Sequence, residues 1–147
     1  MTTPEIAASF NNGMEFFSTF GGSTLSCTVG LAVLETTLAE NLQQHALDVG
    51  SYLLDLLRPL QDKYPLVGDI RGSGLFLGIE LVRDRATLEP ADKEASYVSN
   101  RMRDHHILLG TDGPWHNVVK IRPPMPFTRA NAKLLAMIID KVLAEIS

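Results

Sequence analysis

The sequence has little cysteine and no concentrated positive charge, and both shortages narrow the classes of protein that fit it. Its 147 residues contain one cysteine, Cys27, so the chain has no internal disulfide framework. Thirteen basic against seventeen acidic residues give a formal net charge of -4, and the basic residues gather nowhere beyond the short run RDR at 83–85. Nucleic-acid binding needs a concentrated basic patch, so we expect no nucleic-acid partner.

Long apolar runs are also missing. The N-terminal stretch MTTPEIAASF lacks the basic start and continuous apolar core of a signal peptide. No window approaches the roughly 20 apolar residues that a membrane span requires. The composition, 45% hydrophobic and 20% charged, fits one ordinary globular domain with a real core. We therefore expect a cytoplasmic protein with no membrane partner.

Apolar residues recur at spacings of three and four, which predicts amphipathic helices. The expected helices cover residues 2–10, 25–38, 41–60, 90–105 and 128–146, with a hydroxyl of Thr2-Thr3 capping the first and Thr128 capping the last. Runs rich in leucine and β-branched residues predict strands, and the expected strands lie within 66–82, around a tight turn, and at 107–111 and 118–122, around the turn 112–117. The predicted fold class is α+β: a small, mainly antiparallel sheet covered by helices, with helices 25–38 and 41–60 carrying much of the core.

A stretch rich in hydroxyls and glycines, FFSTFGGSTLSCTVG, precedes the second expected helix. Its candidate donors are Ser18, Thr19, Gly21, Gly22, Ser23 and Thr24. A phosphate needs several convergent N–H and O–H donors, and the start of a helix offers free N–H groups and a partial positive charge. Two interpretations fit these residues: a phosphate site, or a hydroxyl that caps the helix with glycines that only turn the chain.

A second candidate site lies in the stretch NVVKIRPPMPF. Alternation along a strand places Lys120 and Arg122 on one face and Ile121 on the other, just before a rigid Pro-Pro corner. Two cations on one side can hold a carboxylate or a phosphate. They can equally form a solvated strand face.

Other polar groups have no recognised catalytic spacing. Gly72, Gly74 and Gly78 lack the third spacing of a dinucleotide fingerprint. The histidines have no metal-ligand spacing, so we expect no metal. We expect Cys27 to be a small core residue rather than a nucleophile, and Glu80 to be an outward-facing residue at a sheet edge rather than a site carboxylate.

Three stretches together, GMEFFSTFGGSTLSCTVGLAVLE, VGDIRGSGLFLGIELV and NVVKIRPPMPFT, resemble the C-terminal part of class III pyridoxal-phosphate-dependent aminotransferases. Within that class they are most similar to the branch of phospho-lyases that act on ethanolamine phosphate and phosphohydroxylysine. The resemblance implies a fold-type I enzyme in which residues 1–38 are a helical remnant of the large cofactor-binding domain. Residues 39–147 would be the small C-terminal domain.

The resemblance also implies a role for the hydroxyl-rich loop. In this family the residue at the position of Thr19 binds the phosphate of pyridoxal 5'-phosphate in the neighbouring subunit's active site. Ser18, Gly21 and Gly22 would lie beside it, and a homodimer is expected. The family usually has Asn-Pro or His-Pro after the two glycines, whereas this chain has Ser-Thr.

The implied substrate contacts depart from the family pattern. Family aminotransferases usually carry an arginine, three positions before the first proline of the Pro-Pro corner, that clamps a substrate carboxylate. This chain has Lys120 at that position, and Arg122 is shifted by two. A lysine is a point charge without the planar fork of arginine, so a phosphate-bearing amine becomes a candidate substrate.

The family's Schiff-base lysine belongs to the large domain and would precede Met1. The lysines here are Lys63, Lys93, Lys120, Lys133 and Lys141, and none lies in that family context. We therefore assign no catalytic residue and expect the chain alone to be inactive and to bind the cofactor weakly or not at all.

The predicted function is that of a segment of a class III aminotransferase, which transfers an amino group between an amine or amino acid and a keto acid. One alternative is a phospho-lyase that acts on a phosphorylated amine. Another is a non-catalytic binding or regulatory module derived from such an enzyme.

Overall fold

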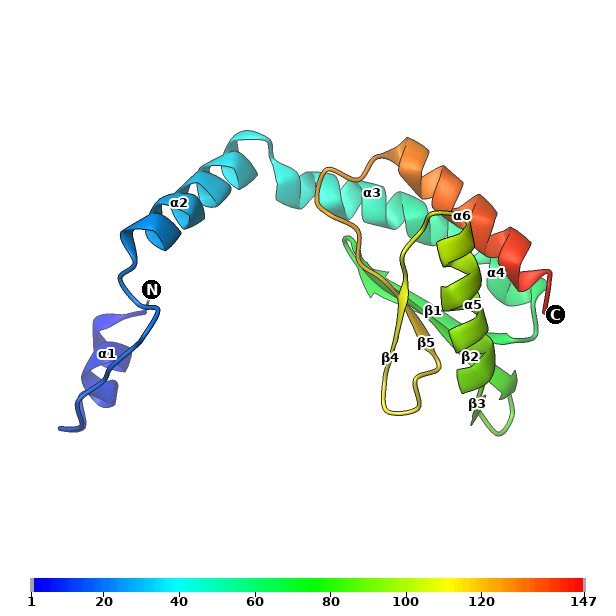
Figure 1. The fold of residues 1–147 in the computed structure, drawn as a ribbon, viewed down its shortest axis with the longest axis horizontal. Coiled ribbons are helices and arrows are strands. Elements are labelled where there is room, and N and C mark those ends of the chain that lie inside the picture. The colour runs from blue at the N-terminus through cyan, green and yellow to red at the C-terminus, as the bar shows by residue number, and fades with distance from the viewer. Residues whose placement is uncertain (1, 147) are drawn as a thin grey trace. The chain divides into compact units, whose positions relative to one another are not determined.

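The computed structural model describes residues 2–146, which divide into two units, one up to Glu35 and one from Thr36. The helices are α1 (Pro4–Phe10), α2 (Thr24–Ala39), α3 (Leu42–Leu57), α4 (Pro59–Lys63), α5 (Asp92–Asp104) and α6 (Arg129–Leu143) (Figure 1). The strands are β1 (Val67–Ser73), β2 (Phe76–Asp84), β3 (Glu89–Pro90), β4 (Gly110–Asp112) and β5 (Val118–Ile121).

The second unit is built on an antiparallel sheet. Its strand order is β1-β2-β5-β4, and β3 pairs with β2 outside this path. Helices α3 and α5 pack on the strands, and α6 packs on both of these helices (Figure 1). The structure thus confirms the predicted α+β class with a small antiparallel sheet and covering helices.

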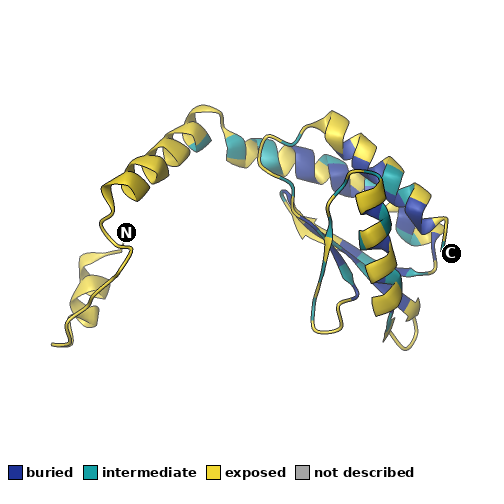
Figure 2. Cartoon of the chain, in the orientation of Figure 1, coloured by how far each residue is buried: buried dark blue, intermediate teal, exposed yellow. Residues whose placement is uncertain are grey.

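The core of the second unit lies between these helices and one face of the sheet (Figure 2). Each layer contributes side chains that are at most 2% exposed, among them Leu53, Leu57, Leu81, Met102, Val119, Ile121, Ile139 and Leu143. Strand β5 alternates between partly and fully buried residues, so its inward side chains face the helices and the opposite face of the sheet stays open.

Helix α2 does not carry the core, contrary to expectation. None of its residues is buried, and Cys27, expected to be a core residue, is exposed. The apolar spacing was misleading because Leu34 lies on the side of the helix opposite Leu25 and Val29, and all three are more than half exposed. A helix that is apolar all round is typical of one surrounded by other protein, rather than one that packs along a single stripe.

Several predicted boundaries also differ. The helix expected at 41–60 ends at Leu57, because Pro59 starts the separate helix α4. The strand expected at 107–111 begins only at Gly110, since the N–H of Ile107 donates to the Met102 carbonyl and finishes the turn that closes α5. Glu80 lies in β2, between β1 and β5, so its expected place at the sheet edge was wrong.

Hydroxyl caps begin two helices where the sequence predicted them. The backbone N–H of Ile6 donates to the Thr3 hydroxyl at the start of α1. At α6, the N–H of Asn131 donates to the Thr128 hydroxyl, and the Asn131 side chain accepts from the Thr128 N–H, which forms a complete capping box.

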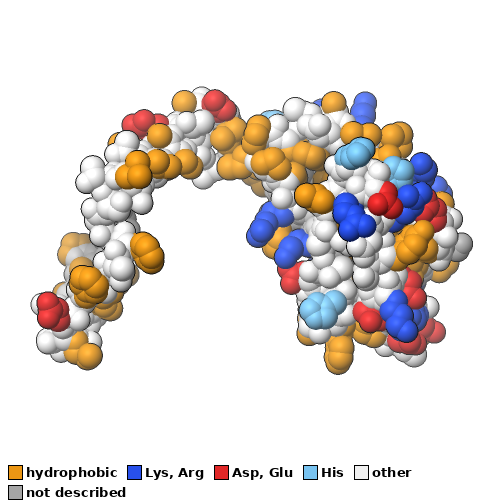
Figure 3. Space-filling view, in the orientation of Figure 1, with side chains coloured by type: hydrophobic (Ala, Val, Ile, Leu, Met, Phe, Trp, Pro, Cys, Tyr) orange, Lys and Arg blue, Asp and Glu red, His pale blue; other side chains and the backbone are white. Residues whose placement is uncertain are grey.

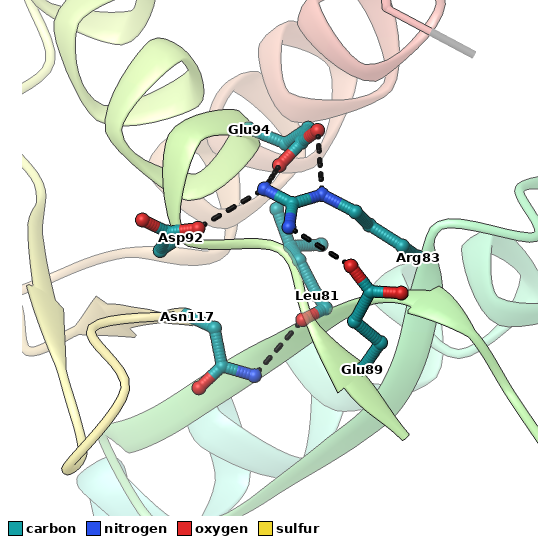
Figure 4. Close-up of polar contacts among 6 residues, drawn as sticks. All are labelled: Leu81, Arg83, Glu89, Asp92, Glu94 and Asn117. Carbon is teal, nitrogen blue, oxygen red and sulfur yellow. Dashed lines mark hydrogen bonds and ion pairs between the residues drawn. The ribbon is translucent and has the colours of Figure 1, made fainter. Parts of the chain in front are cut away.

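An arginine cluster ties β2, β3 and the start of α5 together (Figure 4). The Arg83 guanidinium donates to the carboxylates of Glu89, Asp92 and Glu94 at 3.0–3.2 Å. Its bonds to Glu94 hold the pKa of that carboxyl below its ordinary value. Because the three acids come from two later elements, the cluster fixes where the chain returns after the central strand.

A close contact between two glycines sets how α3 lies on the β1–β2 hairpin. A β-carbon added at Gly50, in the middle of α3, would overlap the backbone carbonyl of Gly74. Gly74 itself has a φ of +54°, a left-handed conformation that suits glycine in this tight turn. The hairpin therefore approaches α3 at a distance that no side chain at position 50 permits.

Substitution of Gly50 by alanine is expected to destabilise the second unit by about 2–3 kcal/mol, because the new methyl group must push the hairpin away. Urea unfolding followed by circular dichroism measures the effect. Gly110→Ala is the matched control, since a β-carbon there meets nothing within 4 Å. Equal stability of the two variants would contradict this view of the contact.

Candidate cofactor and substrate site

In the hydroxyl-rich loop before α2, the Ser18 side chain closes a turn. The N–H of Gly21 donates to the Ser18 hydroxyl oxygen at 3.0 Å. A β-carbon at Gly21 would lie 3.0 Å from that same side chain, and Gly22 has a φ of +74°. The two glycines thus allow a turn that residues with side chains would strain.

The hydrogen bonds of this stretch bear on both interpretations, the helix cap and the phosphate site. The Ser23 hydroxyl accepts from the N–H of Ser26 at 3.4 Å, which is the capping role. The Thr19 hydroxyl, by contrast, makes no hydrogen bond within residues 2–146 and is exposed. Capping therefore leaves Thr19 available to a ligand.

The chemistry of the loop suits a phosphate. Residues 16–34 contain no acidic side chain, so nothing in the stretch repels an anion. Hydroxyls and backbone N–H groups lie ahead of the 16-residue helix α2, whose N-terminus carries a partial positive charge. The donor set therefore fits the phosphate of pyridoxal 5'-phosphate, while the first lysine of the chain is Lys63.

Large apolar side chains surround this loop. Phe16, Phe17 and Phe20 are 72%, 83% and 90% exposed, and Phe10 stacks edge-on against Phe16 with ring centroids 5.7 Å apart. Hydrophobic side chains line the first unit along its visible face (Figure 3). Apolar surface of this extent is typical of an interaction face.

The two predicted cations, Lys120 on β5 and Arg122 just after its end, line different hollows. Lys120 lines a hollow of about 380 Å³ over the open sheet face, whereas Arg122 lines another of about 390 Å³ beside Pro124 and Phe127. The structure therefore does not bring Lys120 and Arg122 into one hollow. Their roles stay predictions.

Lys120 already has an acidic neighbour. Its Nζ lies 2.7 Å from Oδ2 of Asp112 on β4, and this bond holds the pKa of the Asp112 carboxyl below its ordinary value. Asn117 fixes the start of β5 and so the place of Lys120. Its buried side-chain amide donates to the Leu81 carbonyl at 2.9 Å (Figure 4). Its backbone carbonyl accepts from the Leu81 N–H.

A third cation, Arg71, lines the same hollow as Lys120 and was missed from the sequence. Its Nη1 donates to Asp69 at 2.7 Å and to Glu80 at 2.5 Å. The only sequence signal was an arginine inside a predicted strand. Its position beside Lys120 follows from strand pairing, which the local pattern does not contain.

Known proteins that resemble this chain in sequence or in structure include aminotransferases and phospho-lyases. The aminotransferase class-III family matches residues 1–143. The chain belongs to this family. An alanine-glyoxylate aminotransferase 2-like protein of Drosophila melanogaster is 47% identical over 134 residues, which are 90% of this chain and 27% of the relative. An ethanolamine-phosphate phospho-lyase homolog 1 of Caenorhabditis elegans is 40% identical over 97% of this chain and 31% of the relative.

Among solved structures, a phospholyase from Arthrobacter in complex with phosphoethanolamine matches with a TM-score of 0.91 and 34% identity. The match covers 99% of this chain and 35% of that one. The class III resemblance is therefore confirmed. The chain spans about a third of the length of these family members.

Among residues 2–146, no helix has the length and apolar character needed to cross a membrane.

Proposed function

We propose that this chain is the C-terminal segment of a pyridoxal-phosphate-dependent class III aminotransferase that moves an amino group between an amine or amino acid and a keto acid. The observation that carries the proposal is the loop before α2, which is closed by Ser18, free of acidic groups, and leaves the Thr19 hydroxyl unbonded within the described chain. Membership of the family supports it.

Each loop residue has a distinct part in holding the cofactor. Thr19 donates its hydroxyl proton to a phosphate oxygen. Ser18 accepts from the Gly21 N–H and keeps its own hydroxyl proton to donate. Gly22 supplies the left-handed turn that leads into α2. Bound pyridoxal phosphate supplies the electron-withdrawing ring on which amino-group transfer depends.

The loop alone is too weak to retain the cofactor. Two charge-assisted hydrogen bonds contribute roughly 3–6 kcal/mol before any ordering cost. A micromolar dissociation constant needs about 8 kcal/mol. We therefore expect this chain by itself to be inactive and to act within a longer protein that carries the catalytic lysine.

A homodimer is part of the proposal. The exposed phenylalanines around the loop and the all-round apolar surface of α2 support a large protein contact here. In a dimer, the loop of one subunit would serve the active site of the other, and the same contact would cover the apolar surface. A cytoplasmic location stays a prediction.

Mixing two variants of the complete protein that are each impaired at limiting cofactor tests the role of Thr19 in the partner's site. Thr19→Ala is expected to weaken cofactor binding by about 1.5–3 kcal/mol, the contribution of one charge-assisted hydrogen bond. When Thr19→Ala subunits are mixed and refolded with subunits that lack the catalytic lysine, mixed dimers regain one intact site. Amino-transfer activity should therefore return.

Thr28→Ala, which removes an exposed hydroxyl of α2 that donates to the Thr24 carbonyl, serves as the control and should retain activity. No recovery in the mixture would mean that the loop acts within its own subunit or not at all. A complete protein without the lysine-bearing domain would favour the alternative of a non-catalytic module.

A phospho-lyase is the second candidate function, and Lys120 favours it. The lysine stands where family aminotransferases usually carry an arginine, and it lacks the fork that grips a carboxylate in two places. Two of the proteins that this chain resembles are described as phospho-lyases. A phosphorylated amine is therefore an alternative substrate.

Parallel assays of the complete protein separate the two activities. Phosphate release from phosphoethanolamine measures the lyase, and transfer from an amino acid to a keto acid measures the aminotransferase. Lys120→Arg is expected to raise the preference for amino acids about tenfold, the worth of one additional charge-assisted hydrogen bond. Lys133→Arg, an exposed control on α6, should change nothing, and an equal effect of both variants would contradict a role for Lys120.

A further inference from the structure

Arg71 and Lys120 lie on either side of Gly78 on the open face of the sheet. Strand pairing sets Arg71 opposite Gly78, Gly78 opposite Lys120, and Lys120 opposite Gly110. Neighbouring strands lie about 4.8 Å apart, so the α-carbons of the two cations are separated by about 10 Å. Gly78 between them has no side chain, and a β-carbon there would lie 2.9 Å from the Val118 side chain, so Val118 bounds the hollow on this side.

Arg71 keeps its better binding edge free. Asp69 and Glu80 both accept from Nη1, and neither Nε nor Nη2 makes a hydrogen bond within residues 2–146. The Nε–Nη2 edge of a guanidinium can grip an oxyanion with two parallel hydrogen bonds. The two carboxylates therefore hold the arginine in place without occupying that edge.

Lys120 is held in a similar way. Its Nζ donates to Asp112, and two further ammonium protons make no hydrogen bond within the described chain. In the strand pairing, Asp69, Glu80 and Asp112 all lie one row beyond the cations, next to Val118. The acids thus form one row and the cations another.

Both cations line the same hollow of about 380 Å³, with Phe76 and Leu77 among its apolar residues. We propose that Arg71 and Lys120 form a two-sided seat for the phosphate group of a phosphorylated amine substrate, with Asp112 as a built-in competitor for Lys120. The proposal rests on the second candidate function, the phospho-lyase, and deepens it by naming Arg71 and Asp112 as specificity-determining residues.

A phosphate monoester suits this seat better than a carboxylate does. The phosphate carries up to two negative charges and three acceptor oxygens, so it can accept from both sides at once. A carboxylate has one charge and two oxygens, which the arginine edge alone satisfies. The three neighbouring carboxylates outnumber the two cations and oppose every anion, so binding requires a group that accepts hydrogen bonds from both Arg71 and Lys120 at once.

A nuclear magnetic resonance titration of the 147-residue chain with phosphoethanolamine, at constant ionic strength, tests the seat. The Arg71 Nε–H signal and the Gly78 amide signal should shift together and saturate. Arg71→Gln should weaken binding about tenfold. Arg71→Lys, which keeps the charge and loses the fork, should also weaken it.

Asp112→Asn is expected to tighten binding about three- to fivefold, because it releases Lys120 from an exposed ion pair. Asp55→Asn, on α3, removes a carboxylate from another exposed pair, with Arg58, and should change nothing. β-Alanine, which carries a carboxylate in place of the phosphate, should bind more weakly.

Unchanged binding in Arg71→Gln, or shifts confined to other residues, would overturn the seat. Wild-type affinity in Arg71→Lys would contradict the two-hydrogen-bond grip of the Arg71 guanidinium. Equal binding of β-alanine and phosphoethanolamine would contradict the preference for a phosphate over a carboxylate. The titration uses neither cofactor nor partner subunit. A failure here therefore leaves the mixing experiment free to succeed or fail on its own.

Discussion

The hydrogen bond from the Gly21 N–H to the Ser18 hydroxyl gives the loop before α2 its shape. It closes a tight turn at the start of α2, and the glycine at position 21 is needed because a side chain there would press against the serine. The closed turn leaves the neighbouring Thr19 hydroxyl without a partner in the described chain. A phosphate oxygen is the acceptor that such a loop, free of acids and at a helix N-terminus, suits best.

The two units present opposite physical situations. The second unit has its own core, in which helices and sheet share side chains that are almost fully buried. The first unit has an all-round apolar helix and several exposed phenylalanines, but no buried residue in α1 or α2. This contrast agrees with the proposal that the first unit belongs to a larger domain and to a dimer contact. The assignment of residues 1–38 and 39–147 to two domains of the enzyme stays a prediction.

Local sequence patterns predicted the parts of the fold that depend on local physics. The caps at Thr3 and Thr128, the stripe of α3 and the β1–β2 hairpin follow from hydroxyl position, apolar spacing and glycine placement. Helix α2 was misjudged because its apolar residues occur on every side. Cys27, on the same helix, was misjudged with it and is exposed.

Strand order explains what the sequence could not predict in the site. Glu80 was expected at an edge, but β2 pairs on both sides, and that pairing is a long-range property. Arg71 and Lys120 are far apart in the sequence. They come to lie on either side of Gly78 only because β1 pairs with β2 and β2 pairs with β5. The loop residues Ser18, Thr19, Gly21 and Gly22, by contrast, were singled out by local helix-start chemistry and by the family resemblance, and their role in the site stays a prediction.

A structure of the complete protein with pyridoxal phosphate bound gives the most direct measurement, the distance from the cofactor phosphate to the Thr19 hydroxyl. We expect that hydroxyl within about 3 Å of a phosphate oxygen in the active site of the other subunit. A bound phosphate that touches no residue of the loop at 18–22 in either subunit would contradict the central claim.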